Sequence, residues 1–225
     1  MSRWVLHTAA IALPLIAWIL YDSSAPGPQD LRMFNPHEVA CLETEMWRSY
    51  YEGRRAALFF QMSSLLRSQY GFRWLQSQLS AFEATRAAFV FQKGSARPDY
   101  ELALPALRRY YSAIERRSRT PFDVNEAARL ELEWWIIHRE RARYGRTALE
   151  HALAELQSSI FQQRSTAFHE HAAARAAAML VRDELSARGS LTNDEWQRIQ
   201  SDLDRSWTSL HAVVESASAT AKRRQ

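Results

Sequence analysis

Seven ionisable side chains fall on the apolar faces of predicted helices, where charged groups are usually unfavourable. When residues are placed at about 100° intervals around each helix axis, these side chains point with the hydrophobic ones rather than away from them. A carboxylate, imidazole or guanidinium in such a position can bind a ligand, transfer a proton or pair with another charge. The seven candidate ligand-binding residues are Glu43, Arg86, Glu131, His138, His171, Arg175 and Arg182.

Two of the predicted helices carry more than one of these residues. Glu131 and His138 lie seven residues, and therefore about two turns, apart on one face. His171, Arg175 and Arg182 share one side of an alanine-rich helix. Small residues let neighbouring helices approach closely, so we expect this helix to lie inside a bundle.

The simplest role for these groups is to neutralise one another. A charge removed from water costs several kcal/mol unless it is paired and hydrogen-bonded. We therefore predict an internal network in which Glu43 and Glu131 pair with Arg86, Arg175 and Arg182, since arginine forms two parallel hydrogen bonds with a carboxylate. Such a network can serve only to fix the register of the helices.

A metal site is one alternative. Glu43, Glu131, His138 and His171 offer donors suited to iron, manganese or zinc. Helical carboxylate di-iron centres carry Glu-x-x-His on two helices, but this sequence contains neither Glu-x-x-His nor His-Glu-x-x-His. The nearby arginines would also repel a cation, so we predict no metal and no other cofactor.

A ligand pocket and an enzyme are two further alternatives. In the first, the arginines hold the carboxylate or phosphate of a small anionic or polar ligand between tryptophan rings. In the second, Glu43 or Glu131 acts with His138 as an acid–base pair, because burial perturbs both pKa values. No Gly-x-Ser-x-Gly or glycine-rich phosphate loop selects a reaction. The flanking tryptophans are Trp47, Trp134 and Trp135.

An uncharged apolar segment precedes these helices. Trp4–Tyr21 comprises about 18 residues, close to the length that spans a bilayer, and has aromatic residues near both ends. We predict that residues 1–21 form an uncleaved membrane anchor, with a cleaved signal peptide or a buried helix as alternatives. Arg3 precedes the segment and Asp22 follows it. The positive-inside rule therefore favours an extracytoplasmic domain, periplasmic in a bacterium.

Composition predicts an all-α domain. Only 6 glycines and 7 prolines occur among 225 residues, 47% of which are hydrophobic. We predict a linker over residues 22–34, a bundle of about six helices over 35–215 and a disordered basic tail over 216–225. The first helix is expected to run without a break to about residue 70.

Specific residues predict where helices begin and end. Asn35 before proline, Asp123 and the pair Thr192–Glu195 resemble helix N-caps. Gly71 is placed to end the first helix.

The charge pattern argues against a nucleic-acid partner. The net charge is only +4, and the arginines are interleaved with acidic residues, which is typical of a solvated surface.

The predicted anchor and the lack of a catalytic motif together favour a membrane-tethered binding or assembly module with a possible protein partner. The alternative is a metal-dependent or acid–base enzyme that uses Glu43, Glu131, His138 and Arg175. A solvent-connected cavity reaching these four residues would favour the enzyme, and a dry, fully paired cluster would favour the module.

Overall fold

The computed structural model describes residues 13–22 and 29–222, with side chains described as far as residue 217. The described ranges contain helices and no strand, which confirms the all-α prediction. Residues 13–22 are helical. They are followed by α2 (Pro36–Tyr51), α3 (Arg55–Tyr70), α4 (Trp74–Lys93), α5 (Arg97–Glu101), α6 (Leu104–Glu115), α7 (Val124–Arg139), α8 (Arg141–Phe161), the 3₁₀ helix η1 (Ser165–Phe168), α9 (His169–Ser186) and α10 (Asn193–Lys222).

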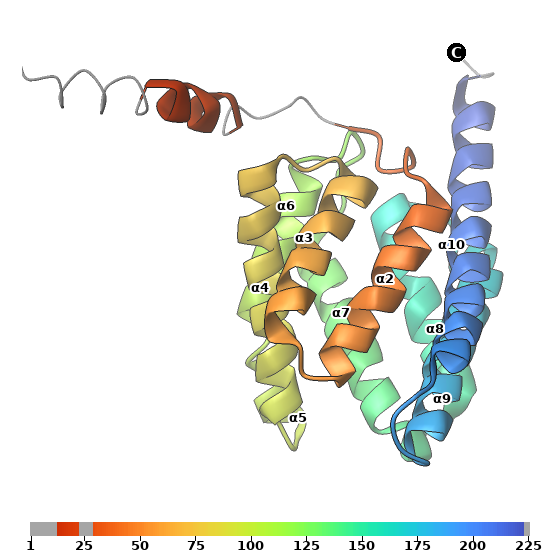
Figure 1. Ribbon diagram of the computed structural model, residues 1–225. Coiled ribbons are helices and arrows are strands. Elements are labelled where there is room, and N and C mark those ends of the chain that lie inside the picture. Colours follow the sequence, from red (N-terminus) through yellow and green to blue (C-terminus); the bar gives the residue numbers. More distant parts are fainter. Residues whose placement is uncertain (1–12, 23–28, 223–225) are drawn as a thin grey trace, which may run out of the picture.

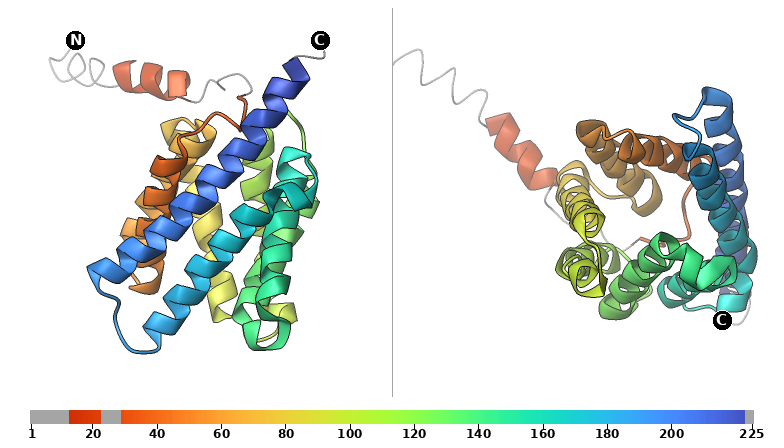
Figure 2. Two further views of the ribbon diagram at one scale, coloured as in Figure 1. Left: turned by 90° about the vertical axis from the view of Figure 1, so that its right-hand side faces the viewer. Right: turned by 90° about the horizontal axis from the view of Figure 1, so that it is seen from below.

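The long helices form a closed ring of antiparallel neighbours (Figure 1). Each helix packs against the next in the order α2, α3, α4, α6, α7, α8, α9 and α10, and α10 packs back against α2. The right-hand view of Figure 2 shows this ring from below, with the helices around a common axis. The ring therefore brings the inner faces of helices that are distant in sequence to one central space.

Four of the predicted helix boundaries are confirmed. The side chains of Asn35 and Asp123 accept hydrogen bonds from the backbone N–H groups two and three residues further on, at the starts of α2 and α7. Thr192 and Glu195 bond reciprocally at the start of α10. Gly71 ends α3 in the left-handed conformation, with φ 59°.

The number of helices differs from the prediction. Gly53, with φ 70°, separates α2 from α3, so the chain turns back instead of continuing as one helix. A further break follows Arg139, and Gly145 interrupts the start of α8 with φ 78°. The expected number of about six is therefore wrong: the chain forms nine α-helices between residues 36 and 222.

The segment before α2 packs onto the ring, although the sequence predicts a linker there. Gln29 exchanges backbone hydrogen bonds with Arg117 and Arg119 at 2.6 and 2.9 Å, and Leu31 and Phe34 are buried. Residues 23–28 of the predicted linker lie outside the described residues.

Asp22 connects the first described helix to α4. Its carboxylate accepts hydrogen bonds from the backbone N–H groups of Trp74 and Leu75 at 3.1 and 2.6 Å. It thereby caps α4, because the side chain of the N-cap residue itself makes no capping hydrogen bond to the first turn. The Trp18 and Trp74 rings also lie against each other, with their centroids 5.5 Å apart.

The predicted anchor over residues 1–21 lies partly outside the described residues. Among the residues that the structure describes, no helix has the length and apolarity needed to cross a membrane. At the other end, α10 continues as a helix to Lys222, past Ser216, where the sequence predicts the tail to begin. Residues 223–225 lie outside the described range.

Candidate functional site

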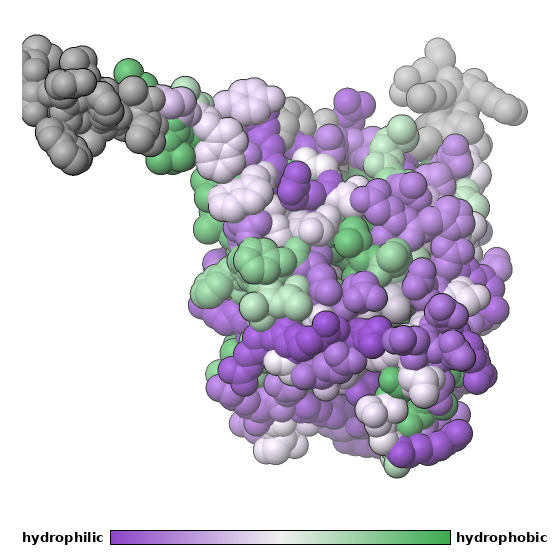
Figure 3. All heavy atoms as spheres, viewed as in Figure 1, coloured by the Kyte–Doolittle hydropathy of each residue, from purple (hydrophilic) through white to green (hydrophobic). Residues whose placement is uncertain are grey.

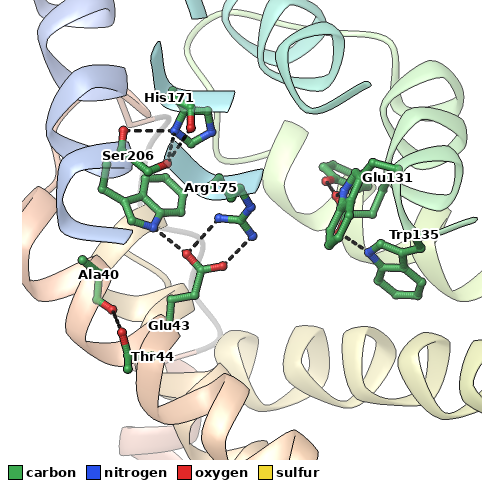
Figure 4. A network of polar contacts seen from close by, with 11 residues as sticks. Ala40, Glu43, Thr44, Glu131, Trp135, His171, Arg175 and Ser206 are labelled. Carbon is green, nitrogen blue, oxygen red and sulfur yellow. Dashed lines mark hydrogen bonds and ion pairs between the residues drawn. The ribbon is translucent and has the colours of Figure 1, made fainter. Parts of the chain in front are cut away.

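A buried ion pair joins α2 to α9. Arg175 donates from Nη1 and Nη2 to the two carboxylate oxygens of Glu43, at 2.8 and 2.5 Å, and Glu43 is only 2% exposed. The indole Nε1 of Trp207 in α10 donates to the same carboxylate at 2.6 Å (Figure 4). The predicted pairing of Glu43 with Arg175 is confirmed, and its two-point geometry offsets the cost of desolvation.

Three tryptophan rings surround the Arg175 guanidinium. Its Cζ atom lies 5.8 Å from the ring centroids of Trp47, Trp134 and Trp207. These rings belong to α2, α7 and α10, so one cation contacts side chains from three other helices. A guanidinium within about 6 Å of an aromatic face is attracted by it.

His171 lies one turn before Arg175 and is fully buried. Its Nδ1 lies 3.0 Å from the carbonyl oxygen of Ser206 and 2.8 Å from the hydroxyl of that residue. Burial, assisted by the charge of Arg175, lowers the pKa of His171 to about 3. The neutral imidazole therefore joins α9 to α10 and does not line the pocket described below.

Glu131 is held by neutral donors. Its Oε2 accepts hydrogen bonds from the Tyr111 hydroxyl and the Trp134 indole at 2.8 and 3.0 Å, and its Oε1 accepts one from the Trp135 indole at 3.0 Å. Figure 4 shows this group apart from the pair formed by Glu43 and Arg175. Burial raises the pKa of Glu131, although the three hydrogen bonds act in the opposite direction. The predicted pairing of Glu131 with an arginine is wrong.

A third polar group surrounds Asp183 on α9. Its carboxylate lies 3.0 Å from Nε2 of His138, 3.1 Å from Nη1 of Arg182 and 3.2 Å from Nη1 of Arg141. Arg182 also lies over the ring of Tyr51. Burial acts to raise the pKa of Asp183, but the hydrogen bond and charge of His138, with the charge of Arg141, hold it below its usual range. Arg182 thus pairs with a carboxylate other than the predicted ones.

Arg86 lies on the outside of the ring, which contradicts the predicted internal position. Its side chain is 45% exposed and faces Glu83 at 3.6 Å, one turn earlier on α4. Glu83 also pairs with Arg109 of α6 at 2.8 Å. The large apolar residues near Arg86, Leu79 and Phe82, are exposed as well. The stripe of α4 that is buried consists mainly of small residues, so hydrophobicity alone identified the wrong face.

A pocket of about 350 Å³ occupies the central space of the ring. Its wall includes the aromatic side chains of Trp47, Tyr50, Tyr110, Trp134 and Trp135.

The pocket contains three of the predicted site residues and connects to solvent. Glu131, His138 and Arg175 line it, whereas Glu43 does not. Arg141, which is 45% exposed, lies at its edge beside the C-terminal end of α2.

The predicted metal donors do not converge. Glu43, Glu131, His138 and His171 have separate hydrogen-bond partners. In residues 13–22 and 29–222, no three His, Cys, Asp or Glu side chains are grouped to hold a metal ion. Glu131 and His138 line the same pocket, but each is bonded to a different group.

Placing the residues around each helix axis did not identify two important residues, Asp183 and Trp207. Asp183 follows Arg175 by eight residues and Met179 by four, which places all three on one side of α9. Trp207 lies on the apolar face of α10, where a buried indole N–H requires an acceptor. Both positions can be recognised in the sequence, but neither position identifies the residue with which the side chain is hydrogen-bonded.

Comparisons with protein-family models, with curated proteins and with solved structures found no match. The chemistry of the site is therefore inferred from its geometry alone.

The ion pair predicts that replacing Glu43 or Glu131 by alanine lowers the free energy of unfolding by different amounts. Glu43→Ala strands the Arg175 guanidinium and should lower the free energy of unfolding by about 3–5 kcal/mol. Glu131→Ala leaves only neutral donors beside the pocket and should cost about 1–3 kcal/mol. Urea denaturation of the full-length variants measures both losses. A larger loss for Glu131→Ala would show that the assignment of the main ion pair is wrong.

His171 predicts a pH dependence of stability. Its pKa is about 3 in the folded chain and about 6.5 when unfolded, so between these values the unfolded chain binds more protons. Stability from this residue is complete above pH ~6.5 and falls by about 1.4 kcal/mol for each pH unit below it. His171→Asn removes the titration but keeps an N–H donor. Denaturation curves between about pH 4 and 6 should depend less steeply on pH in this variant, and equal slopes would contradict the assignment.

Proposed function

We propose that the protein is a membrane-tethered helical binding module whose ring encloses the site for a small ligand. The supporting observation is a solvent-connected, aromatic-lined pocket at the centre of a closed ring. Sites for small molecules are typically concave, mostly apolar and about 300–1,000 Å³ in volume, with a few fixed polar groups. The pocket of about 350 Å³ lies within this range.

The polar contacts support a preformed pocket. Arg175 is held by Glu43, and Asp183 is held by basic groups from α7, α8 and α9. The bonds that Glu43, His138 and Arg141 form with α9 connect different helices, so they restrain the walls before a ligand arrives. A site that is already ordered loses less conformational entropy on binding.

The solvent-connected pocket reaches three of the four residues that the catalytic alternative requires, which by itself would favour an enzyme, but the hydrogen-bond partners of the ionisable groups favour binding. His138 is hydrogen-bonded to Asp183 and Glu131 to two indoles and a phenol, so they do not form one hydrogen-bonded acid–base pair. The catalytic alternative would require both groups to act on one substrate across the pocket.

The first described helix supports the membrane tether. Its apolar side chains are exposed, including Leu15 at 53%, Ile16 at 51% and Leu20 at 65%. Figure 3 shows hydrophobic atoms on this helix beside the mainly hydrophilic surface of the ring. A lipid bilayer would cover these side chains, and they continue the uncharged segment that begins at Trp4. The charge bias around that segment supports an extracytoplasmic ring.

Filling the pocket tests ligand binding. Ala88 of α4 lines the pocket, whereas Ala142 of α8 is exposed and does not. Small molecules extracted from the purified full-length chain are counted by mass spectrometry. We expect a near-stoichiometric compound in the wild type and in Ala142→Trp, and its loss in Ala88→Trp, because the larger side chain occupies the ligand's space. The absence of any such compound, or its retention in Ala88→Trp, would contradict the proposed pocket function.

Arginine substitution tests the tether. Leu13→Arg combined with Ile16→Arg places two charges near the middle of the apolar segment, each costing about 2.5–3.5 kcal/mol in a bilayer. The wild-type chain should remain with membranes after extraction at alkaline pH, and the double variant should be released. Leu79→Arg, on the exposed surface of α4, is the control and should remain bound. Release of the wild type would refute the anchor, and a reporter fused after Gln225 that is active only in the cytoplasm would refute the orientation.

A further inference from the structure

The basic side chains in the pocket wall already have partners. Arg175 is bonded through two nitrogens to Glu43. Arg141 faces Asp183 at 3.2 Å. Arg139 donates to backbone carbonyl oxygens at the C-terminal end of α4 at 2.9–3.2 Å, where the helix dipole is negative. An anion entering the pocket would therefore compete with contacts that are already formed.

Glu131 is the pocket carboxylate that lacks such a counter-charge. Its three hydrogen-bond donors are two indole N–H groups and a hydroxyl, all of them neutral. Among the described residues it forms no ion pair, and Arg175, whose charge acts to lower the pKa of Glu131, is itself bonded to Glu43. When Glu131 is ionised, the pocket contains a negative charge that no bonded cation neutralises.

The rings around Glu131 suit a cationic group. The indoles of Trp134 and Trp135 both donate to the carboxylate, and their ring planes meet at 83° with centroids 6.1 Å apart. They therefore form a corner beside the carboxylate, and Trp47 and Tyr110 extend the aromatic wall. Aromatic faces attract alkylammonium groups, most strongly where water is excluded.

We propose that the pocket binds an organic cation, a primary to quaternary alkylammonium, between the Glu131 carboxylate and the faces of Trp134 and Trp135. This inference rests on the proposed binding function and deepens it by naming the ligand class. It differs from the anionic ligand that was one alternative suggested by the sequence, because Arg175 and Arg182 are paired with carboxylates within the protein and Arg86 lies outside the ring.

The arginines Arg139 and Arg141 of the pocket wall do not prevent the binding of a cation. Arg141 is 45% exposed, so water and salt screen its charge, and Asp183 lies against it. Arg139 is turned toward the carbonyl groups of α4 and the rings of Phe91 and Tyr100.

Binding of a cation should be coupled to the ionisation of Glu131. The groups that face it are Tyr70 from α3, Tyr110 and Tyr111 from α6, and Arg175 from α9 with Glu43 of α2 behind it. His138 lies further along α7 on the same pocket. Burial raises the pKa of all three tyrosines, so they stay neutral while Glu131 titrates. The affinity for a cation should therefore fall as the pH decreases through the raised pKa of Glu131.

Three probes of similar shape and different charge test the proposal. Benzyltrimethylammonium is the cation, neopentylbenzene its neutral isostere and phenylacetate an anion. Their binding to the full-length chain is measured by the quenching of tryptophan fluorescence. We expect the cation to bind about tenfold or more tightly than the neutral probe, and the anion to bind most weakly.

Two variants assign the effect to Glu131. Glu131→Gln keeps the size and an acceptor oxygen, so it should bind the neutral probe normally but lose the preference for the cation. Glu133→Gln is the matched control on α7, because Glu133 pairs with Arg97 on the surface. It should bind all three probes like the wild type. The wild-type affinity for the cation, but not for the neutral probe, should also decrease on acidification.

The outcomes separate this inference from the pocket itself. If the neutral or anionic probe binds as well as the cation and Ala88→Trp abolishes that binding, the ligand class is wrong and the pocket function stands. If Glu131→Gln retains the full preference for the cation, the site assignment is wrong. If none of the probes binds, the ligand class is wrong; if, in addition, no small molecule accompanies the purified chain, both proposals fail.

Discussion

Two opposite charges can stay inside a ring of helices only if each replaces the water that the other has lost. Glu43 and Arg175 satisfy this condition through two short hydrogen bonds, with the Trp207 indole as a third donor to the carboxylate. The pair connects α2 with α9, which are separated in the ring by α10. It therefore links positions 132 residues apart in the chain and restrains how α10 can pack between them.

The same ion pair determines which charged side chains in the centre of the ring remain without a paired counter-charge. Arg175 is paired with Glu43 and packs against the rings of Trp47 and Trp134. It therefore lines the pocket without being an unpaired cation. Glu131, held by neutral donors, then becomes the distinctive charged group. In the function that we propose, the ion pair of Glu43 and Arg175 stabilises the interior of the ring, and Glu131 gives the pocket its selectivity.

Individual residues show how far helical periodicity could predict this arrangement. The inward position of Glu43 and its pairing with Arg175 followed from placing apolar residues on one face and from the cost of an unpaired charge. The same projection failed for Arg86, because the large apolar residues of α4 lie on its outer side. It also missed Asp183, since a carboxylate beside an arginine is expected to be solvated. Periodicity identifies a polar residue on an apolar stripe but does not show whether that stripe faces inward.

The sequence by itself determined that the domain is helical and where several helices begin, because these properties depend on local capping and on the scarcity of glycine and proline. It also determined that buried charges would have to be paired, since that cost applies to any compact fold. Only the tertiary structure decided that the helices close into a ring and which carboxylate meets which arginine. Those outcomes depend on the left-handed turn at Gly53 and on the packing of α10 against α2, which bring together residues that no local rule relates.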